Sequence, residues 1–491
     1  MVLISEVVLI YDPAMRFLSA VAALLLFVTA PVPAQTFTVP VEYFKLDNGL
    51  KVVVSTDRSA PVVLVEVIYN IGFRVEPKGR TGFAHLFEHM MFQGSANVKK
   101  MEHVSLMQEA GGIVNGSTRF DYTNYFQSLP SNGLERALFL EADRMRSLDV
   151  TAENLKNQQN VVSEEVRVNV LNQPHGAFDW IEIWERANTN WHNAHDFYGK
   201  LDELEAATIE DVRAFFKTYY APNNAVLVVA GDATAAEVKR LAAKHFGSIP
   251  SQPQPAPADL TEPPQTAPKS FTRTDKLART PAIAVAWHLP PRMTKDFFAL
   301  SVLDPLLNSD DSARMYRKLV REERLAMSSQ GGFNFLGPNW DMKGPMLYTM
   351  RVDYFNDKTA DQVIAAIESV LDDVRKNGIT PAELAQAKTT MRSAFLDDME
   401  GGGMPLFGRA NLLGVFALFD DDPSRINTIL GELDKVTLDE VKAAAAKWLV
   451  TSNRTSIDSR PAAKPSASLP ADPSAVVATM AEALAKVGGA Q

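Results

Sequence analysis

Two short segments of this chain recur at the same distance along the sequence. The run Thr208-Ile-Glu-Asp-Val-Arg-Ala-Phe-Phe-Lys217 resembles Thr437-Leu-Asp-Glu-Val-Lys-Ala-Ala-Ala-Ala-Lys447, and Thr151-Ala-Glu-Asn-Leu155 resembles Thr380-Pro-Ala-Glu-Leu384. In both pairs the copies are 229 positions apart, and a shared spacing is hard to obtain by chance. The repeat predicts two related halves of roughly 200 residues each.

Within each half, strand patterns alternate with long helical patterns. The segments 41–46 and 50–55 flank Asp47-Asn48-Gly49, which is typical of a β-hairpin, and long helical patterns cover 134–147, 152–171, 209–219 and 235–246. We therefore predict an α+β fold of two homologous halves, each a mainly antiparallel sheet packed with long helices. The Pro- and Gln-rich stretch 250–268 has few large apolar residues and is expected to be an extended linker.

These patterns divide the chain into five parts. We expect a signal peptide at 1–34, a catalytic half at 35–249, the linker at 250–268, a degenerate half at 269–460 and an Ala/Pro-rich tail at 461–491. The signal peptide follows from Arg16, the apolar run Phe17–Thr29 and the small residues before Gln35. Met15-Arg16 is a more usual start for such a signal than Met1. The apolar run is too short for a comfortable transmembrane helix, so we expect a periplasmic protein with no stable membrane insertion after cleavage.

The charge of the chain excludes one class of partner. The net charge is -10, the acidic residues are dispersed, and no long run of Lys or Arg occurs. This balance argues against a nucleic-acid-binding groove. The chain contains no cysteine, so a metal site would have to use histidines and carboxylates.

The segment His85-Leu86-Phe87-Glu88-His89 carries the clearest chemical signal. It lies in a stretch that reads as a helix, where residues i and i+4 share one face and both imidazoles can reach one ion. The pattern H-x-x-E-H is the inverzincin motif of zinc peptidases. A catalytic zinc needs a third protein ligand and an open position, and Glu164 and Glu165 on a separate predicted helix are the candidates.

At this point the sequence resembles the pitrilysin/insulinase family of zinc metallopeptidases. That family carries H-x-x-E-H followed, at about this distance, by a glutamate ligand in a helix reading V-V-x-x-E, here Val161-Val162-Ser-Glu-Glu165. The resemblance also includes Asn115-Gly-Ser-Thr118 with Asp121-Tyr-Thr-Asn-Tyr125, and it spans nearly the whole chain after the signal. It implies zinc held by His85, His89 and Glu165, with Glu164 as the alternative to Glu165.

The resemblance also implies a role for the residues around the metal. Zinc lowers the pKa of a water in its open position to about 7, and Glu88 is expected to act as general base and then general acid. In the family a second acidic residue often stands seven positions before the glutamate ligand, but here Gln158 occupies that place. The family's substrates pair with a free strand edge, which corresponds here to 112–118 with Asn115, Gly116 and Ser117. The alternative is a covered internal strand with a glycine bend.

A pair of residues typical of the family is missing from the second half. Family members that act alone usually read L-R-x-x-x-x-L-x-Y, whose arginine and tyrosine grip the substrate. Aligning Leu319 and Leu325 with this pattern puts Val320 and Met327 at those two places, and Arg321 is one residue away. In the two-subunit branch a homologous, zinc-free partner supplies the pair. The resemblance therefore implies a heterodimer in which this chain is the zinc subunit.

Two other functions and one other metal motif remain open at this stage. The chain could be a non-catalytic core-type scaffold subunit, or a peptide-binding module that uses only the strand edge. The motif His192-Asn-Ala-His195 is a second H-x-x-H, which we expect to lie in a surface loop because its surroundings are rich in Asn and Thr. In the second half the counterpart of the H-x-x-E-H helix, near 298–308, has no histidine, so we expect one metal site per chain.

Overall fold

The computed structural model describes residues 38–334, 336–400 and 404–462. Every helix and strand described below lies after Val39. The predicted signal peptide at 1–34 lies outside the described residues. Of the predicted tail at 461–491, only Pro461 and Ala462 are described.

The first sheet has six strands in the order β1-β2-β6-β3-β5-β4. All neighbouring strands are antiparallel except β2 and β6, which are parallel. Its strands are β1 (Glu42–Lys45), β2 (Lys51–Thr56), β3 (Val62–Tyr69), β4 (Ile113–Thr118), β5 (Thr123–Pro130) and β6 (Ala225–Gly231). The central strands β3 and β6 are rich in valine and buried on both faces, as expected for strands covered from two sides.

The second sheet has five strands in the order β7-β11-β8-β10-β9. Only β7 and β11 are parallel, and the other neighbouring pairs are antiparallel. Its strands are β7 (Lys269–Asp275), β8 (Ala282–His288), β9 (Ala326–Gly332), β10 (Leu347–Tyr354) and β11 (Arg454–Pro461). Two sheets, each mainly antiparallel and each packed with helices, confirm the predicted α+β architecture.

Helices fill the connections between the strands. Those before the linker are α2 (Phe83–Met90), α3 (Glu102–Glu109), α4 (Leu134–Ser147), α5 (Ala152–Val166), α6 (Ile183–Ala187), α7 (Trp191–Ala194), α8 (Leu201–Glu205), α9 (Ile209–Tyr219) and α10 (Ala235–Phe246). Those after it are α11 (Lys295–Asn308), α12 (Arg314–Tyr316), α13 (Ala360–Asn377), α14 (Pro381–Glu400), α15 (Phe407–Asp420), α16 (Ile429–Lys435) and α17 (Leu438–Trp448). Four short helical turns that are not α-helical are also named below: η1 (Phe73–Val75), η3 (Arg167–Leu171), η4 (Phe178–Glu182) and η6 (Arg317–Glu322).

The repeat seen in the sequence is also a structural repeat. Helices α9 and α17 have equal lengths and begin 229 positions apart, and each begins with a capping box made by a threonine, Thr208 or Thr437, and an acidic residue three positions later. Strands β6 and β11, which follow these helices, also begin 229 positions apart. Helix α14 occupies the place of α5 together with η3 at the same offset.

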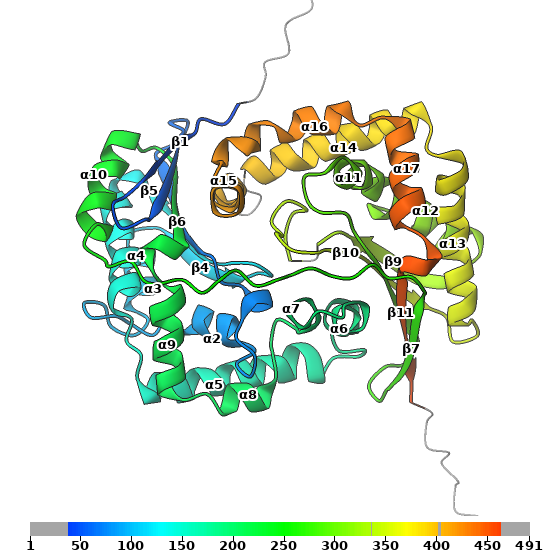
Figure 1. Ribbon diagram of the computed structural model, residues 1–491, viewed down its shortest axis with the longest axis horizontal. Coiled ribbons are helices and arrows are strands. Elements are labelled where there is room, and N and C mark those ends of the chain that lie inside the picture. Colours follow the sequence, from blue (N-terminus) through cyan, green and yellow to red (C-terminus); the bar gives the residue numbers. More distant parts are fainter. Residues whose placement is uncertain (1–37, 335, 401–403, 463–491) are drawn as a thin grey trace, which may run out of the picture. The chain divides into compact units, whose positions relative to one another are not determined.

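The two halves exchange helices across their sheets. Helix α15 packs against β3 and β6 of the first sheet, where Figure 1 shows it in orange, while α6 and η4 pack against β8 and its neighbours in the second sheet. Where α15 packs against the first sheet, the buried Asn411 Nδ2 of α15 donates a hydrogen bond of 3.1 Å to Glu66 Oε1 of β3. Each sheet is therefore covered in part by helices from the other half of the chain. The division into halves at 35–249 and 269–460 stays a prediction.

The predicted linker contains no helix or strand between α10 and β7 (Figure 1). It is nevertheless held in place along its length. The Glu262 carboxylate accepts hydrogen bonds from Thr189 N at 2.6 Å and Asn193 Nδ2 at 3.0 Å, and Gln265 Nε2 donates to Arg454 O at 2.8 Å. None of the helices in the described part of the chain is both long and apolar enough to cross a membrane.

Candidate metal centre

Helix α2 presents the H-x-x-E-H motif on one short, firmly held segment. The helix begins after Gly82, whose φ of 81° lies in the left-handed region that glycine adopts without strain. The buried carboxylate of Glu76 then accepts the backbone N–H groups of Gly82 at 2.8 Å and Ala84 at 2.6 Å. These bonds satisfy N–H groups that the first turn of a helix leaves without partners, and the positive end of the helix faces the carboxyl group.

The three predicted ligands converge on one point. His85 Nε2 and His89 Nε2 are 3.3 Å apart, and Glu165 Oε2 of α5 lies 3.6 Å from the first and 3.3 Å from the second. His85 is buried, while the side chains of His89 and Glu165 are 21% and 30% exposed. The group therefore opens to solvent on one side, as a catalytic metal site requires.

The spacing and chemistry of this group fit a zinc ion. Four ligands at about 2.0–2.1 Å in a tetrahedron are separated from one another by about 3.3–3.4 Å, close to the three distances measured here. Burial and the neighbouring His89 lower the pKa of His85 to about 3, so its ring is neutral and free to bind a metal. Burial opposes ionisation of Glu165, but the hydrogen bond that it accepts from His89 and its electrostatic interaction with the two rings leave the pKa of Glu165 lowered.

The alternative ligand, Glu164, points away from this group. Its side chain is 64% exposed and pairs with Arg167 at 3.2 Å. Among the described residues, one cluster of at least three potential metal ligands from the His, Cys, Asp and Glu side chains is found, and it consists of His85, His89 and Glu165. The structure thus brings together the ligand set that the resemblance favoured.

Glu88 lies beside the ligands but is held by a different partner. Thr118 Oγ1 at the end of β4 donates a hydrogen bond of 2.7 Å to Glu88 Oε2. Burial raises the pKa of Glu88, and the hydrogen bond from Thr118 acts against this rise. On the same strand, a Cβ atom added to Gly116 would lie 3.3 Å from Glu88 Cγ, so the absence of a side chain there leaves room for the glutamate.

Strand β4 is an edge strand of the first sheet. Among the described strands it pairs only with β5, so the expected free edge is present and the alternative of a covered internal strand is wrong. Helix α2 packs against β4, which places this edge next to the metal ligands. Of the three residues expected to meet the substrate, Gly116 lies against Glu88, whereas the Asn115 side chain accepts its neighbour's N–H and Ser117 Oγ donates to Asn124 Oδ1 at 2.5 Å.

Further residues support the ligands. Gln158 forms a side-chain hydrogen bond with His89, so a neutral amide acts where the family often has a carboxylate. Tyr198, which the sequence reasoning missed, donates to Glu165 Oε1 at 3.3 Å and packs its ring against that of His85, as Phe197 also does. The only signal for these aromatic residues was their position before Gly199, in a stretch without helical or strand periodicity.

The prediction for the second H-x-x-H was wrong. Trp191–Ala194 form a short helix, α7, and the His195 ring is 9% exposed and stacked on Trp191 at a centroid distance of 4.2 Å. His192 Nδ1 lies 3.0 Å from Arg74 O. Both rings are engaged with protein groups, because aromatic packing and backbone contacts override the polar composition of the segment.

The two positions that align with the family's substrate-gripping arginine and tyrosine lie in η6 and β9. Val320 is half-buried in η6, and Met327 is 41% exposed at the start of β9. The neighbouring Arg321 is exposed and forms an ion pair with Asp311 at 3.5 Å. Its guanidinium is therefore directed to a surface carboxylate.

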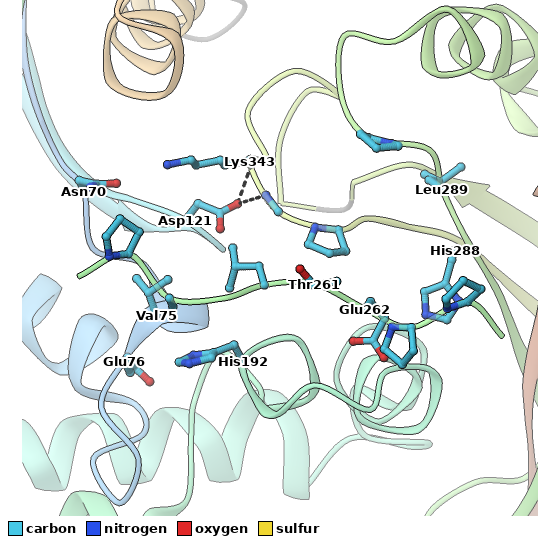
Figure 2. A pocket seen from close by; sticks show the side chains of 18 of the residues that line it. Asn70, Val75, Glu76, Asp121, His192, Thr261, Glu262, His288, Leu289 and Lys343 are labelled. Carbon is cyan, nitrogen blue, oxygen red and sulfur yellow. Dashed lines mark hydrogen bonds between the residues drawn. The ribbon is translucent and has the colours of Figure 1, made fainter. Parts of the chain in front are cut away.

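A separate cavity lies next to the linker. It has a volume of about 1150 Å³, and its lining includes linker residues together with Glu76, His192, Asp121, Lys343 and His288 (Figure 2). None of His85, His89 and Glu165 lines it. The metal ligands and this cavity are thus different sites, with Glu76 in contact with both the cavity and helix α2.

The two-half α+β fold and the candidate His-His-Glu metal site together are typical of a class of metallopeptidases. Comparison with family models identifies the family: residues 51–183 match "Insulinase (Peptidase family M16)" and residues 206–391 match "Peptidase M16 inactive domain". The chain belongs to the M16 peptidase family. The second match begins at residue 206, within the predicted catalytic half 35–249.

Curated relatives and solved structures agree with this assignment. The chain is 28% identical to "Zinc protease PqqE" of Helicobacter pylori over 410 residues, which cover 82% of this chain and 88% of that protein. It is 25% identical over 213 residues to "Probable mitochondrial-processing peptidase subunit beta, mitochondrial" of Arabidopsis thaliana, covering 42% of this chain and 39% of that protein.

Among solved structures, a protease from Helicobacter pylori has a TM-score of 0.79 and 25% identity, covering 86% of this chain and all of that one. The periplasmic protease PqqL from Escherichia coli has a TM-score of 0.69 and 18% identity, covering 91% of this chain and 50% of that one. This last likeness shows the fold. It also shows that one copy of this chain corresponds to half of a longer neighbour.

Proposed function

We propose that this protein is a zinc metalloendopeptidase that hydrolyses extended or unfolded peptides. The observation that carries this proposal is the triangle of His85 Nε2, His89 Nε2 and Glu165 Oε2, with sides of 3.3, 3.3 and 3.6 Å. A carboxylate that is not a ligand, Glu88, stands beside the triangle on the same helix as the histidines. A scaffold subunit would have no need to preserve this combination.

The three ligands would hold one zinc ion, which in such a site polarises a carbonyl group and makes water more acidic. Glu88 Oε2 accepts the hydrogen bond from Thr118, and none of the described residues donates to Oε1. Oε1 is therefore placed to take a proton from the attacking water and to deliver it to the departing amine. Burial raises the pKa of Glu88, which brings it closer to the working pH and makes it more able to return that proton.

The free edge of β4 supplies a way to hold the substrate backbone. An extended peptide can add a strand to this edge, with hydrogen bonds to those backbone groups of the segment Asn115, Gly116 and Ser117 that face away from β5. Pairing of this kind reads the peptide backbone and needs an unfolded segment. The absence of a side chain at Gly116 would let the peptide run close to Glu88.

Hydrolysis of an unstructured peptide by the purified protein tests this function. We expect about one zinc per chain, cleavage of a denatured protein or long peptide, loss of cleavage on treatment with a chelator, and its return on addition of zinc. Binding of the peptide without cleavage at full zinc occupancy, in the presence of any co-purifying subunit, would favour a peptide-binding module instead.

We further propose that this chain works with a homologous, zinc-free subunit. Val320 and Met327 occupy the places where the substrate-gripping arginine and tyrosine are expected, and Arg321 is engaged with Asp311. This chain matches half of the longer protein PqqL, and one relative is described as a mitochondrial-processing peptidase subunit beta. A partner would supply the missing pair and close a chamber of four related parts over the metal centre.

Purification from the native host under mild conditions tests the partnership. We expect a second chain of similar size that carries the arginine and tyrosine and raises the hydrolysis rate of this one. Rapid hydrolysis by the isolated chain, unchanged by that second chain, would contradict the heterodimer. The same preparation tests the proposed periplasmic location, since cleavage of the signal would leave Gln35 as the first residue.

A further inference from the structure

The second H-x-x-H motif has no place in the proposed chemistry, yet both of its rings contact the same turn. That turn is η1, which precedes helix α2. His192 Nδ1 lies 3.0 Å from Arg74 O, and His195 Nε2 is in hydrogen-bond contact with Phe73 O. The other nitrogen of His195, Nδ1, lies 2.9 Å from Trp191 O. The motif therefore clamps the backbone of η1 onto α7.

The residue that follows η1 is Glu76, whose side chain is completely buried. Its two oxygens have separate partners: Oε1 accepts the N–H of Ala84 at 2.6 Å, and Oε2 accepts that of Gly82 at 2.8 Å. His195 Nε2 lies 3.8 Å from Oε2 on the other side. A chain of contacts thus leads from α7 through η1 and Glu76 to the residue immediately before the ligand His85.

The same segment also reaches the third ligand. Continuing from His195, the chain arrives at Tyr198, which donates to Glu165 Oε1 at 3.3 Å. Here the backbones of Gly82 and Gly199 touch, since a Cβ atom added to Gly199 would lie 2.3 Å from Gly82 N, and one added to Gly82 would lie 2.4 Å from Tyr198 O. The segment 191–199 therefore contacts both parts of the ligand set, the start of α2 and Glu165 on α5.

We propose that Glu76 and His195 are positioning residues of the metal centre, which fix the start of helix α2 relative to Glu165. The inference rests on the proposed zinc site but not on the proposed peptidase activity. The ligands come from two helices far apart in sequence, so a small rotation of α2 would open the triangle of ligand atoms. The N–H groups of Gly82 and Ala84 point to different oxygens of Glu76, so both carboxylate oxygens are needed in this arrangement, and Glu76 is buried where water cannot replace it.

The variant Glu76→Gln tests this directly, because its amide offers one acceptor and turns an NH₂ group toward one of the two N–H groups. Zinc affinity is measured by competition with a chelator, and the visible spectrum of the cobalt-loaded protein reports the ligand geometry. We expect the zinc dissociation constant to rise by about 10–100-fold, the range seen when groups that support metal ligands are removed, together with a changed cobalt spectrum. His195→Gln is expected to weaken zinc binding in the same direction, because glutamine cannot contact both Phe73 O and Trp191 O.

Glu203→Gln is the matched control. Glu203 Oε2 alone accepts both the N–H of Thr81, at 3.0 Å, and its hydroxyl, at 2.7 Å, so a glutamine oxygen can keep both bonds. Its zinc affinity should stay within about twofold of the wild type. The melting temperature of each metal-free variant identifies loss of fold, and if Glu76→Gln does not fold, His195→Gln decides.

Folded variants with wild-type zinc affinity and an unchanged cobalt spectrum would overturn the proposal, even if their melting temperatures fell, because the two residues would then serve the fold alone. A wild-type protein that bound no zinc would overturn this proposal and the proposed function together. Zinc binding without hydrolysis would contradict only the proposed function, since the affinities can still be compared.

Discussion

Helices α2 and α11 hold corresponding places in the two halves of the molecule. Each follows a central strand, β3 or β8, and packs against an edge strand, β4 or β9. Each also packs against a long helix, α5 or α14, whose starting positions are 229 residues apart. The scaffold around the metal centre is therefore present twice.

The side chains at these corresponding places are very different. On α2 the ligands His85 and His89 face Glu165 of α5, whereas α11 is largely apolar and Ala394 on α14 takes the place of Glu165. The polar residue Asp304 on α11 is hydrogen-bonded to Tyr348, and burial raises the pKa of Asp304 to about 7. Pro305 lies within α11, which continues to Asn308. Metal chemistry in this fold thus depends on a few side chains placed on a repeated scaffold.

The largest change in zinc content and hydrolysis should come from removing a metal ligand of α2, compared with the matched change on α11. We expect His89→Ala to lower zinc content from about one per chain to nearly none and to abolish hydrolysis, because two ligands do not hold a catalytic zinc. Asp304→Asn, the matched change on α11, should leave both unchanged. Metal analysis of the dialysed proteins checks this, and a second zinc bound through Asp304 would break the proposed asymmetry.

A smaller effect is expected from filling the space beside Glu88. In Gly116→Ala, the new Cβ would meet Glu88 Cγ at 3.3 Å and Tyr125 Cδ1 at 3.1 Å. A shift of a few tenths of an ångström in the general base should lower kcat by about tenfold, with zinc content unchanged. In β9, the corresponding edge strand of the second sheet, a Cβ atom on Gly332 would meet nothing closer than Asp304 Oδ2 at 3.9 Å, so Gly332→Ala should preserve kcat. Equal kcat values for the two variants would show that the β4 edge does not position Glu88.

The smallest effect should come from Thr118→Val, which removes the hydrogen bond to Glu88 Oε2. A hydrogen bond to a charged group is worth about 1.5–3 kcal/mol, which would be about 10–150-fold in rate if all of it acted on the reaction. Because this bond only orients Glu88, we expect a loss of about tenfold or less in kcat. This hydrogen bond lowers the pKa of Glu88, so its loss should raise that pKa further. Since the base must be ionised, the acidic limb of the pH–rate profile should move to higher pH. A shift toward lower pH would contradict the assigned role of Thr118.

The sequence predicted those features that depend on local patterns. Helices α4, α9 and α10 have the expected bounds, and the i,i+4 spacing placed His85 and His89 on one face of α2. The repeat predicted the corresponding helices because both copies keep the threonine of the capping box. Glu165 came from the family resemblance, since nothing in the sequence relates the orientation of α5 to that of α2.

Contacts between distant segments could not be predicted in this way. The roles of Tyr198 and His195 depend on the packing of 191–199 against η1 and α2, and the segment itself has a polar, irregular composition. The exchange of α15 and α6 between the sheets is also invisible in the sequence, because an apolar helix face does not specify which sheet covers it. The periodicity of the sequence thus predicted individual helices and strands, whereas their packing against one another is known only from the structure.

The most direct test of the central claim is to measure zinc content and kcat of Glu88→Gln in one preparation, with the partner subunit present if the wild type needs it. The account predicts about one zinc per chain, as in the wild type, and a kcat lower by about 10²–10⁴-fold, because the ligands remain while the proton acceptor is lost. A variant that retains zinc and hydrolyses peptide at the wild-type rate would contradict the account.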